Sequence, residues 1–176
     1  MLGLEGLKHG GDAIDLAPER LAAANINPTT RLATDYLNHF NNVVMLLEFI
    51  ATMPDFVEEI RQWTPVDYPR YFATSHFRHR DLAIAAYHAA DGKVRAQFEA
   101  IIGALDQAVL EAQALLAESD PTDPAISVVI LDLVRGRMQP LIAEASGVIN
   151  GACNVAEQII EPHAGNAQDS IDELFP

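Results

Sequence analysis

Apolar side chains recur at alternating steps of three and four residues along most of the sequence. In the first such stretch they are Ala33, Tyr36, Phe40, Val43, Leu47 and Ile50. An α-helix has about 3.6 residues per turn, so this spacing places all of them on one face. We therefore expect an amphipathic helix over 30–52, and a hydroxyl of Thr29 or Thr30 can cap its first turn.

Prolines mark the next boundaries. Pro54 fits the first turn of a second helix over 54–63. The segment 63–69 contains Pro65 and Pro69, and two prolines so close together prevent regular backbone pairing. We therefore expect this segment to be an irregular connector between helices.

Two longer stretches keep the same apolar step, over 75–118 and 123–161. Only a short turn separates them, so the two helices are expected to run antiparallel. Their repeat is close to 3.5 residues, which favours wrapping of one helix around the other. The pattern thus predicts a long antiparallel coiled-coil-like hairpin.

Single residues modify this hairpin. Ser75 can cap its first helix. Asp91 is a polar residue within the apolar stripe and is followed by Gly92, so the helix can kink or restart there. Pro140 should bend the second helix, because proline cannot donate to the preceding turn, and Pro162 should end it.

No strand-type alternation of any length occurs, so we expect an all-α fold, a helical bundle built on the hairpin. The bundle domain spans 29–163. Residues 1–28 lack a sustained apolar period and are expected to form a flexible N-terminal arm. Residues 164–176 are expected to form an acidic C-terminal tail.

Aromatic side chains divide the predicted bundle unevenly. The chain has seven Phe, four Tyr and one Trp, and all of them except Phe175 lie between Tyr36 and Phe98. The far end of the hairpin therefore offers only aliphatic side chains, and the first two helices are too short to cover it. We expect a second copy of the chain to cover it, which predicts a homodimer.

The net charge is −14, from 25 acidic and 11 basic side chains. A nucleic-acid-binding domain needs a basic surface to neutralise phosphates, so this charge argues against nucleic acid as a partner. The single Cys excludes a disulfide framework within the chain. Neither an apolar run of about 18 residues nor a cationic secretory start is visible. We therefore expect a cytoplasmic protein that does not enter a membrane.

One segment of this acidic chain is cationic. Residues 70–80, here called the basic shoulder, begin at Arg70 and end in the run Phe77-Arg78-His79-Arg80. Arg78 and Arg80 lie in the first turns of the predicted third helix, where the helix dipole disfavours positive charge. An anion or an acidic partner would explain this placement, and the alternative is ion pairing with acids of the protein itself. The candidates for partner or anion binding are Arg70, His76, Arg78, His79 and Arg80.

The same region holds candidate metal ligands. Histidine and carboxylate side chains on bundle helices commonly ligate transition metals. At about 100° per residue, His79 and His88 point to opposite sides of one helix, so a site needs one pair plus ligands from the first helix. The candidate set is Asp35, His39, His76 and His79. The usual metal-binding motifs are absent from the sequence, and we expect no metal or other cofactor.

Motifs for nucleophilic catalysis are also absent. Cys153 lies beside an apolar stripe, where a buried thiol behaves as a small apolar side chain. The sequence contains no Ser-x-x-Lys, no Gly-x-Ser-x-Gly and no phosphate-cradling glycine loop. The sequence therefore does not predict an enzyme.

The chain ends in an acidic peptide with three apolar anchors. Ile171, Leu174 and Phe175 have the i, i+3, i+4 spacing of one helical face, which favours folding on a partner. Residues 168–176 resemble the acidic docking peptides of flagellar chemotaxis proteins, which bind the response regulator. This resemblance implies a docking role for the tail. The alternative is an acidic terminus that only increases solubility.

Together these features predict a cytoplasmic interaction or regulatory adaptor. It would present the basic shoulder and the acidic tail to protein partners. The alternative is a metal- or small-ligand-binding helical bundle, with enzymatic activity left open, that uses His and Asp residues near the start of the third helix.

Overall fold

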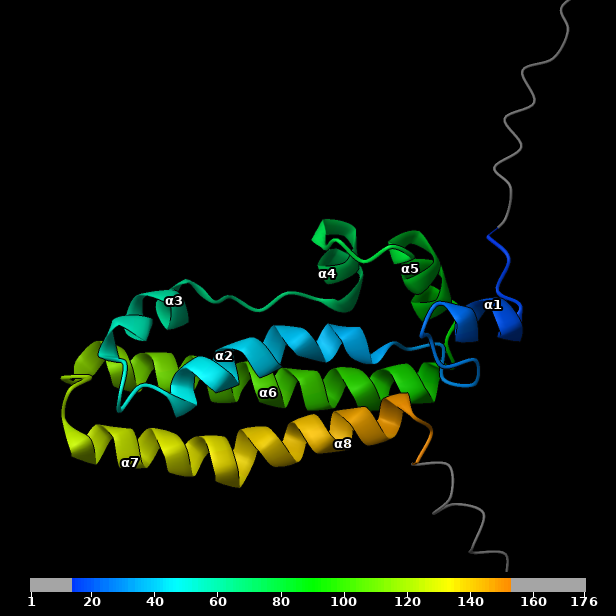
Figure 1. The fold of residues 1–176 in the computed structure, drawn as a ribbon. Helices are drawn as coiled ribbons and strands as arrows, with labels where there is room; N and C mark the ends of the chain where they lie inside the picture. The colour runs from blue at the N-terminus through cyan, green and yellow to red at the C-terminus, as the bar shows by residue number, and fades with distance from the viewer. Residues whose placement is uncertain (1–13, 153–176) are drawn as a thin grey trace, which may run out of the picture.

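The computed structural model describes residues 14–152, and this part of the chain is mostly helical and contains no strand (Figure 1). The all-α prediction is therefore confirmed. The α-helices are α1 (Pro18–Ala23), α2 (Asn38–Glu48), α3 (Val57–Gln62), α4 (Tyr68–Thr74), α5 (Arg80–His88), α6 (Gly92–Glu118), α7 (Pro124–Leu133) and α8 (Gln139–Ile149). Two 3₁₀ turns, η1 (Thr34–Leu37) and η2 (Pro54–Phe56), precede α2 and α3.

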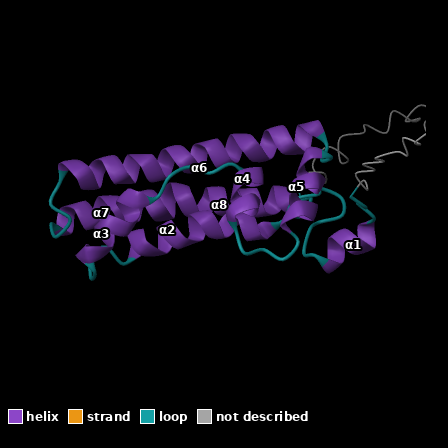
Figure 2. Cartoon of the chain, turned by 90° about the horizontal axis from the view of Figure 1, so that it is seen from above, coloured by secondary structure: helices purple, strands orange, loops and turns teal. Residues whose placement is uncertain are grey.

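The long helices form the body of the molecule. Helices α7 and α8 return along α6 after the turn at 119–123, and α2 packs beside them (Figures 1 and 2). The short helices α3, α4 and α5 lie over α2 and α6 (Figure 1). Helix α1 lies at the same end of the body as the C-terminal end of α8 (Figure 1).

The predicted helix over 75–118 is two helices, α5 and α6, separated by residues 89–91. Ser75 does not cap either of them, because it follows the last turn of α4. Asp91 begins α6 instead, and its carboxylate accepts hydrogen bonds from the backbone N–H groups of Lys93 (2.8 Å) and Val94 (3.3 Å). The polar residue in the apolar stripe therefore marks a restart of the helix and not a kink.

Helix α4 begins within the last residues of the predicted irregular connector, 63–69. Asp67 caps it by accepting from the N–H of Arg70 at 2.8 Å, and Pro69 lies in its first turn. Proline is tolerated there because the first N–H groups of a helix have no partner within the helix. Pro69 therefore starts a helix in a segment where we expected it to prevent one.

The last long helix is interrupted and short. A π-helical turn, Val134–Met138, separates α7 from α8 and lies just before Pro140. Pro140 has no backbone N–H, so it cannot donate a hydrogen bond to the carbonyl one turn earlier. This missing bond accounts for the irregular turn at the predicted bend. Helix α8 ends at Ile149 and residues 150–152 form a turn, although the helix was expected to continue. The rest of the predicted helix, 153–161, lies outside the described residues, as does Pro162.

The first long helix begins later than the predicted residue 30. Thr30 is buried, and its hydroxyl donates to the carbonyl of Ile149 at 2.5 Å, so it fastens the loop before η1 to the end of α8. Asn27 shapes this loop by accepting from the N–H groups of Thr29 and Thr30. Thr30, whose hydroxyl was expected to cap the first helix, thus binds the last residue of α8 instead.

The core extends into the predicted N-terminal arm. Leu21, Ala24 and Ile26 are buried with the side chains of the bundle, so the segment from α1 onward packs on the body. Residues 1–13 lie outside the described part. Within residues 14–152, α6 is the one helix long and apolar enough to cross a membrane by length and composition, a test that a core helix also passes. Its apolar stripe, from Phe98 to Leu116, is buried in the core.

Candidate functional site

The basic shoulder comprises α4 from Arg70 onward, the loop 75–79 and the first residue of α5. All five of its predicted binding side chains are exposed. The ring of Phe77 packs against Phe72 with centroids 5.0 Å apart, and Phe72 is fully buried. The loop between Arg70 on α4 and Arg80 on α5 is therefore attached to the core by an aromatic contact.

The arginines of the shoulder differ from most others in their pairing. Arg61 binds Glu58 at 2.8 Å and Arg137 binds Glu111 at 2.6 Å. In the shoulder, the shortest ion pair is that of Arg80 with Asp81, at 3.9 Å between two exposed groups. Among the described residues, the side chains of Arg70 and Arg78 make no ion pair or hydrogen bond.

The candidate metal ligands are separated. His39 stacks on Trp63, with centroids 4.9 Å apart, and its Nε2 lies 3.1 Å from the carbonyl oxygen of Thr64. Burial lowers the pKa of His39, and the contact with Thr64 opposes this shift. His76 and His79 lie on the exposed shoulder. Within residues 14–152, no three His, Cys, Asp or Glu side chains gather closely enough to hold a metal ion.

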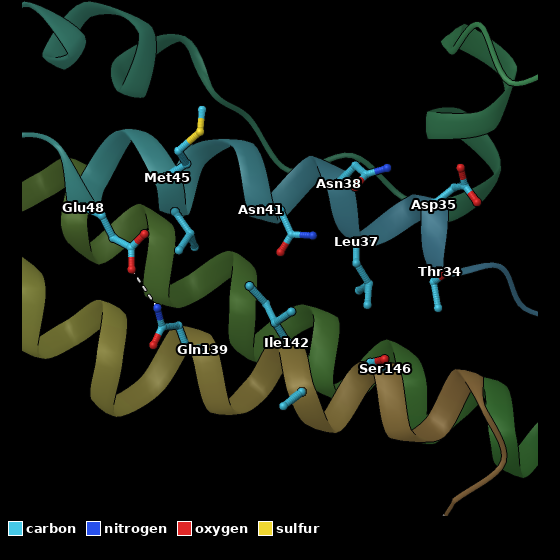
Figure 3. Close-up of a pocket in the computed structure, with 12 residues that line it drawn as sticks. Thr34, Asp35, Leu37, Asn38, Asn41, Met45, Glu48, Gln139, Ile142 and Ser146 are labelled. Atoms are coloured by element: carbon cyan, nitrogen blue, oxygen red, sulfur yellow. Dashed lines mark hydrogen bonds between the residues drawn. The ribbon is translucent and has the colours of Figure 1, made fainter.

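An open groove of about 660 Å³ runs between the η1–α2 segment and α8 (Figure 3). Leu37 and Asn41 point toward α8, and at one end Gln139 donates to Glu48 at 2.7 Å (Figure 3). Its polar lining is Thr34, Asp35, Asn38, Asn41, Glu48, Gln139 and Ser146. Of these residues only Asp35 was a candidate from the sequence, because the polar face of any amphipathic helix looks the same.

A second cavity, here called the tyrosine pocket, has a volume of about 410 Å³. It lies where the connector 65–67 and the start of α4 meet the end of α5 and the first half of α6. Its aromatic residues are Tyr36, Tyr68, Tyr87 and Phe98. Its carboxylates are Asp67, Glu99 and Asp106, and Pro65, Val66, Ile102 and Gly103 complete the lining.

The tyrosine hydroxyls of this pocket have fixed partners. Tyr36 donates to the carbonyl of Val66 at 2.7 Å, and Tyr87 donates to Glu99 at 2.5 Å. The hydroxyl oxygen of Tyr68 accepts from the N–H of Ala33 at 2.8 Å. Burial raises the pKa of all three tyrosines. These groups therefore remain neutral and hold the walls of the pocket.

Asp106 is the unusual member of the pocket. Its Oδ1 is buried and has no hydrogen-bond partner among the described residues. Burial raises the pKa of Asp106 from 3.8 to about 6. Sequence reasoning missed this residue because it follows Leu105 of the apolar stripe and looks like any acid on the polar face of a helix.

Comparisons of the chain with protein-family models, with curated proteins and with solved structures find no match. The described helices define the class of protein as an all-α helical bundle. Its function has to be argued from the surface and cavities described above. The candidate tail residues Ile171, Leu174 and Phe175 lie outside the described residues.

Proposed function

We propose that this protein is an interaction or regulatory adaptor, cytoplasmic as its sequence predicts, that binds an acidic segment of a protein partner through the basic shoulder. The observation that supports this most strongly is the lack of partners for Arg70 and Arg78 among the described residues. In a chain of charge −14, acids are plentiful, yet these exposed cations have none bound. An acidic partner would supply the missing charge-assisted hydrogen bonds.

The chemistry of the shoulder sets the mode of binding. Guanidinium groups bind carboxylates through two parallel hydrogen bonds, while exposed charges attract a partner over a distance that salt shortens. We therefore expect rapid, salt-sensitive association and not a permanent complex. The acidic tail remains a second proposed docking element, which would bind a different, apolar and basic site on a partner.

We also propose a homodimer through the aliphatic end of the bundle. Helix α7 is apolar on most of its surface but buries only Ser127 and Ile130. Val128 and Val129 are 58% and 47% exposed. Helices that are apolar all round are normally buried, so a second copy covering this face is favoured. We further propose that α6 packs on α7 and α8 in the manner of a coiled coil.

For the alternative function, a ligand-binding bundle, the candidate site differs from the one that the sequence predicted. The metal version has no suitable group of ligands within residues 14–152. The small-ligand version is favoured by the tyrosine pocket, which does not contain the predicted candidates His76 and His79.

The adaptor proposal is tested with two charge-matched variants. The first replaces Arg70, Arg78 and Arg80 by Ala, and the control replaces the exposed Arg20, Lys93 and Arg135 by Ala. Each variant and the wild type serve as bait in native cell extract at 50 and at 300 mM salt. The Debye length is about 14 Å at the lower and about 6 Å at the higher concentration. Captured proteins are quantified by mass spectrometry.

The proposal expects at least one protein captured by the wild type and by the control but lost from the shoulder variant and at high salt. If the shoulder variant captures the same proteins in the same amounts as the wild type, the shoulder is not a docking surface.

A further inference from the structure

We infer that the tyrosine pocket is a binding site for a small organic cation, a primary amine carried on a compact apolar body. The inference is independent of the adaptor proposal, since the pocket shares no side chain with the cations of the shoulder. It rests on the acids of the pocket, on its apolar walls and on its shape.

The acidic side chains of the pocket favour a positively charged ligand. Asp67, Glu99 and Asp106 line one cavity, and no basic side chain lines it with them. Arg95 pairs with Glu99 at 3.6 Å and lies over the ring of Tyr87, 5.7 Å from its centroid. Arg95 is therefore engaged at the rim. An anion would be repelled from this cavity.

Asp106 is the acid that lacks a partner. Glu99 is bound by Tyr87, and Asp67 accepts from the N–H of Arg70. The buried Oδ1 of Asp106 has no such donor among the described residues. Leaving a buried acceptor unpaired is unfavourable, and polar groups in this state commonly mark a site for a water molecule or a ligand. Asp106 lines the pocket and is only partly buried as a residue. An ammonium group has three N–H donors and would pair with the carboxylate from inside the pocket.

The remaining walls fit an apolar body. Pro65, Val66 and Ile102 supply aliphatic surface, and the Phe98 ring lies 5.9 Å from the Tyr68 ring at a near-perpendicular angle. Small-molecule sites typically combine such a lining with a few polar groups, in volumes of about 300–1,000 Å³. At about 410 Å³, the pocket suits a molecule with one ring or a short branched chain.

Gly103 lies at the rim of the pocket, and a larger side chain at this position would narrow the entrance. A Cβ at this position would meet no atom within 4 Å, so the space over the rim is open. Alanine and leucine also favour the helix there, because glycine is a weaker helix former than either. Gly103→Leu should therefore narrow the entrance without unfolding α6, and Gly103→Ala is its matched control.

The test is isothermal titration calorimetry of the full chain at pH 7.5 and 150 mM salt. The probes are 2-phenylethylamine, the neutral 2-phenylethanol of the same size, and 1,4-diaminobutane, which lacks the apolar body. Asp106→Asn removes one of the three carboxylates of the pocket, and Asp132→Asn removes one exposed charge outside the pocket. Circular dichroism verifies that each variant is folded.

We expect saturable 1:1 binding of 2-phenylethylamine and affinity at least about tenfold lower for the other two probes. Asp106→Asn and Gly103→Leu should each weaken amine binding about tenfold or more, while Asp132→Asn and Gly103→Ala should stay within about twofold of the wild type. The inference is overturned if 2-phenylethylamine shows no saturable binding, if the alcohol binds as well as the amine, or if Asp106→Asn binds the amine like the wild type.

Discussion

The basic shoulder and the tyrosine pocket adjoin along one short helix, α4, and differ in how their charged groups are placed. Asp67 and Tyr68, at the start of α4, belong to the pocket, while the shoulder begins at Arg70 and continues past the end of α4. The cations of the shoulder are exposed and largely unpaired. The Asp106 oxygen of the pocket is buried and unpaired. Exposed charge has little effect on folding, whereas a buried carboxylate opposes it.

This difference predicts which region tolerates substitution. The exposed arginines of the shoulder should affect partners and hardly affect stability. Side chains of the pocket should affect stability, and Asp106 should do so in a pH-dependent way. The predictions below follow this contrast from the largest expected change in the free energy of unfolding to the smallest.

Phe98→Ala should have the largest effect, because Phe98 is fully buried between the tyrosines of the pocket. We expect a loss of about 3–5 kcal/mol, the usual result of removing a large core side chain. Phe49→Ala is the matched control, since Phe49 is half-exposed, and should lose less than about 1 kcal/mol. Urea denaturation monitored by circular dichroism measures both. Equal losses would contradict the assignment of the pocket walls to the core.

Tyr36→Phe should destabilise the protein by about 1 kcal/mol, because the carbonyl of Val66 loses its donor while the ring stays in place. The same denaturation experiment measures the difference. A variant as stable as the wild type would show that the connector 65–67 is not held by this hydrogen bond.

Asp106→Asn should stabilise the protein at pH 7.5. Burial raises the pKa of Asp106 from 3.8 to about 6, so folding favours its protonated form. The unfavourable effect of the charge is complete above pH 6 and disappears as the pH falls below 3.8. The neighbouring titratable groups Tyr36, Asp67 and Glu99 remain in both proteins.

After solvent screening of this half-buried group, we expect a gain of about 1 kcal/mol at pH 7.5 that shrinks toward zero near pH 4. Denaturation of both proteins across this pH range measures it. A gain that grows as the pH falls would have the wrong sign for a buried carboxylate.

Arg78→Ala should change stability by less than about 0.5 kcal/mol at any salt concentration, because its side chain is exposed and has no partner among the described residues. Thermal unfolding at 50 and 500 mM salt measures this. A loss of stability greater than about 1 kcal/mol at 50 mM salt that disappears at 500 mM salt would reveal an intramolecular role for the shoulder.

Local patterns in the sequence predicted much of the fold. The apolar step located α2, α5, α6, α7 and α8, because helical periodicity depends on neighbouring residues alone. It missed α4, since Pro65 and Pro69 suggest a break until the cap by Asp67 is known. It also continued the last helix past Ile149, whose carbonyl accepts from the distant hydroxyl of Thr30, a contact that no local pattern shows.

The sites were less accessible to sequence reasoning. The shoulder was found because its cations are contiguous in an acidic chain. The tyrosine pocket was not found, because its lining comes from segments as far apart as Tyr36 and Asp106. The buried oxygen of Asp106 follows from how these segments pack, and no local spacing encodes it.

Site-specific photo-crosslinking tests the central claim, that the shoulder is the docking surface, most directly. A benzophenone amino acid replaces His76 in one protein and Arg135 in another, and each is irradiated in native cell extract at 50 mM salt. We predict a discrete crosslinked partner from position 76, absent at 300 mM salt, and none of the same mass from position 135. The same adduct from position 135 and none from position 76 would contradict the account.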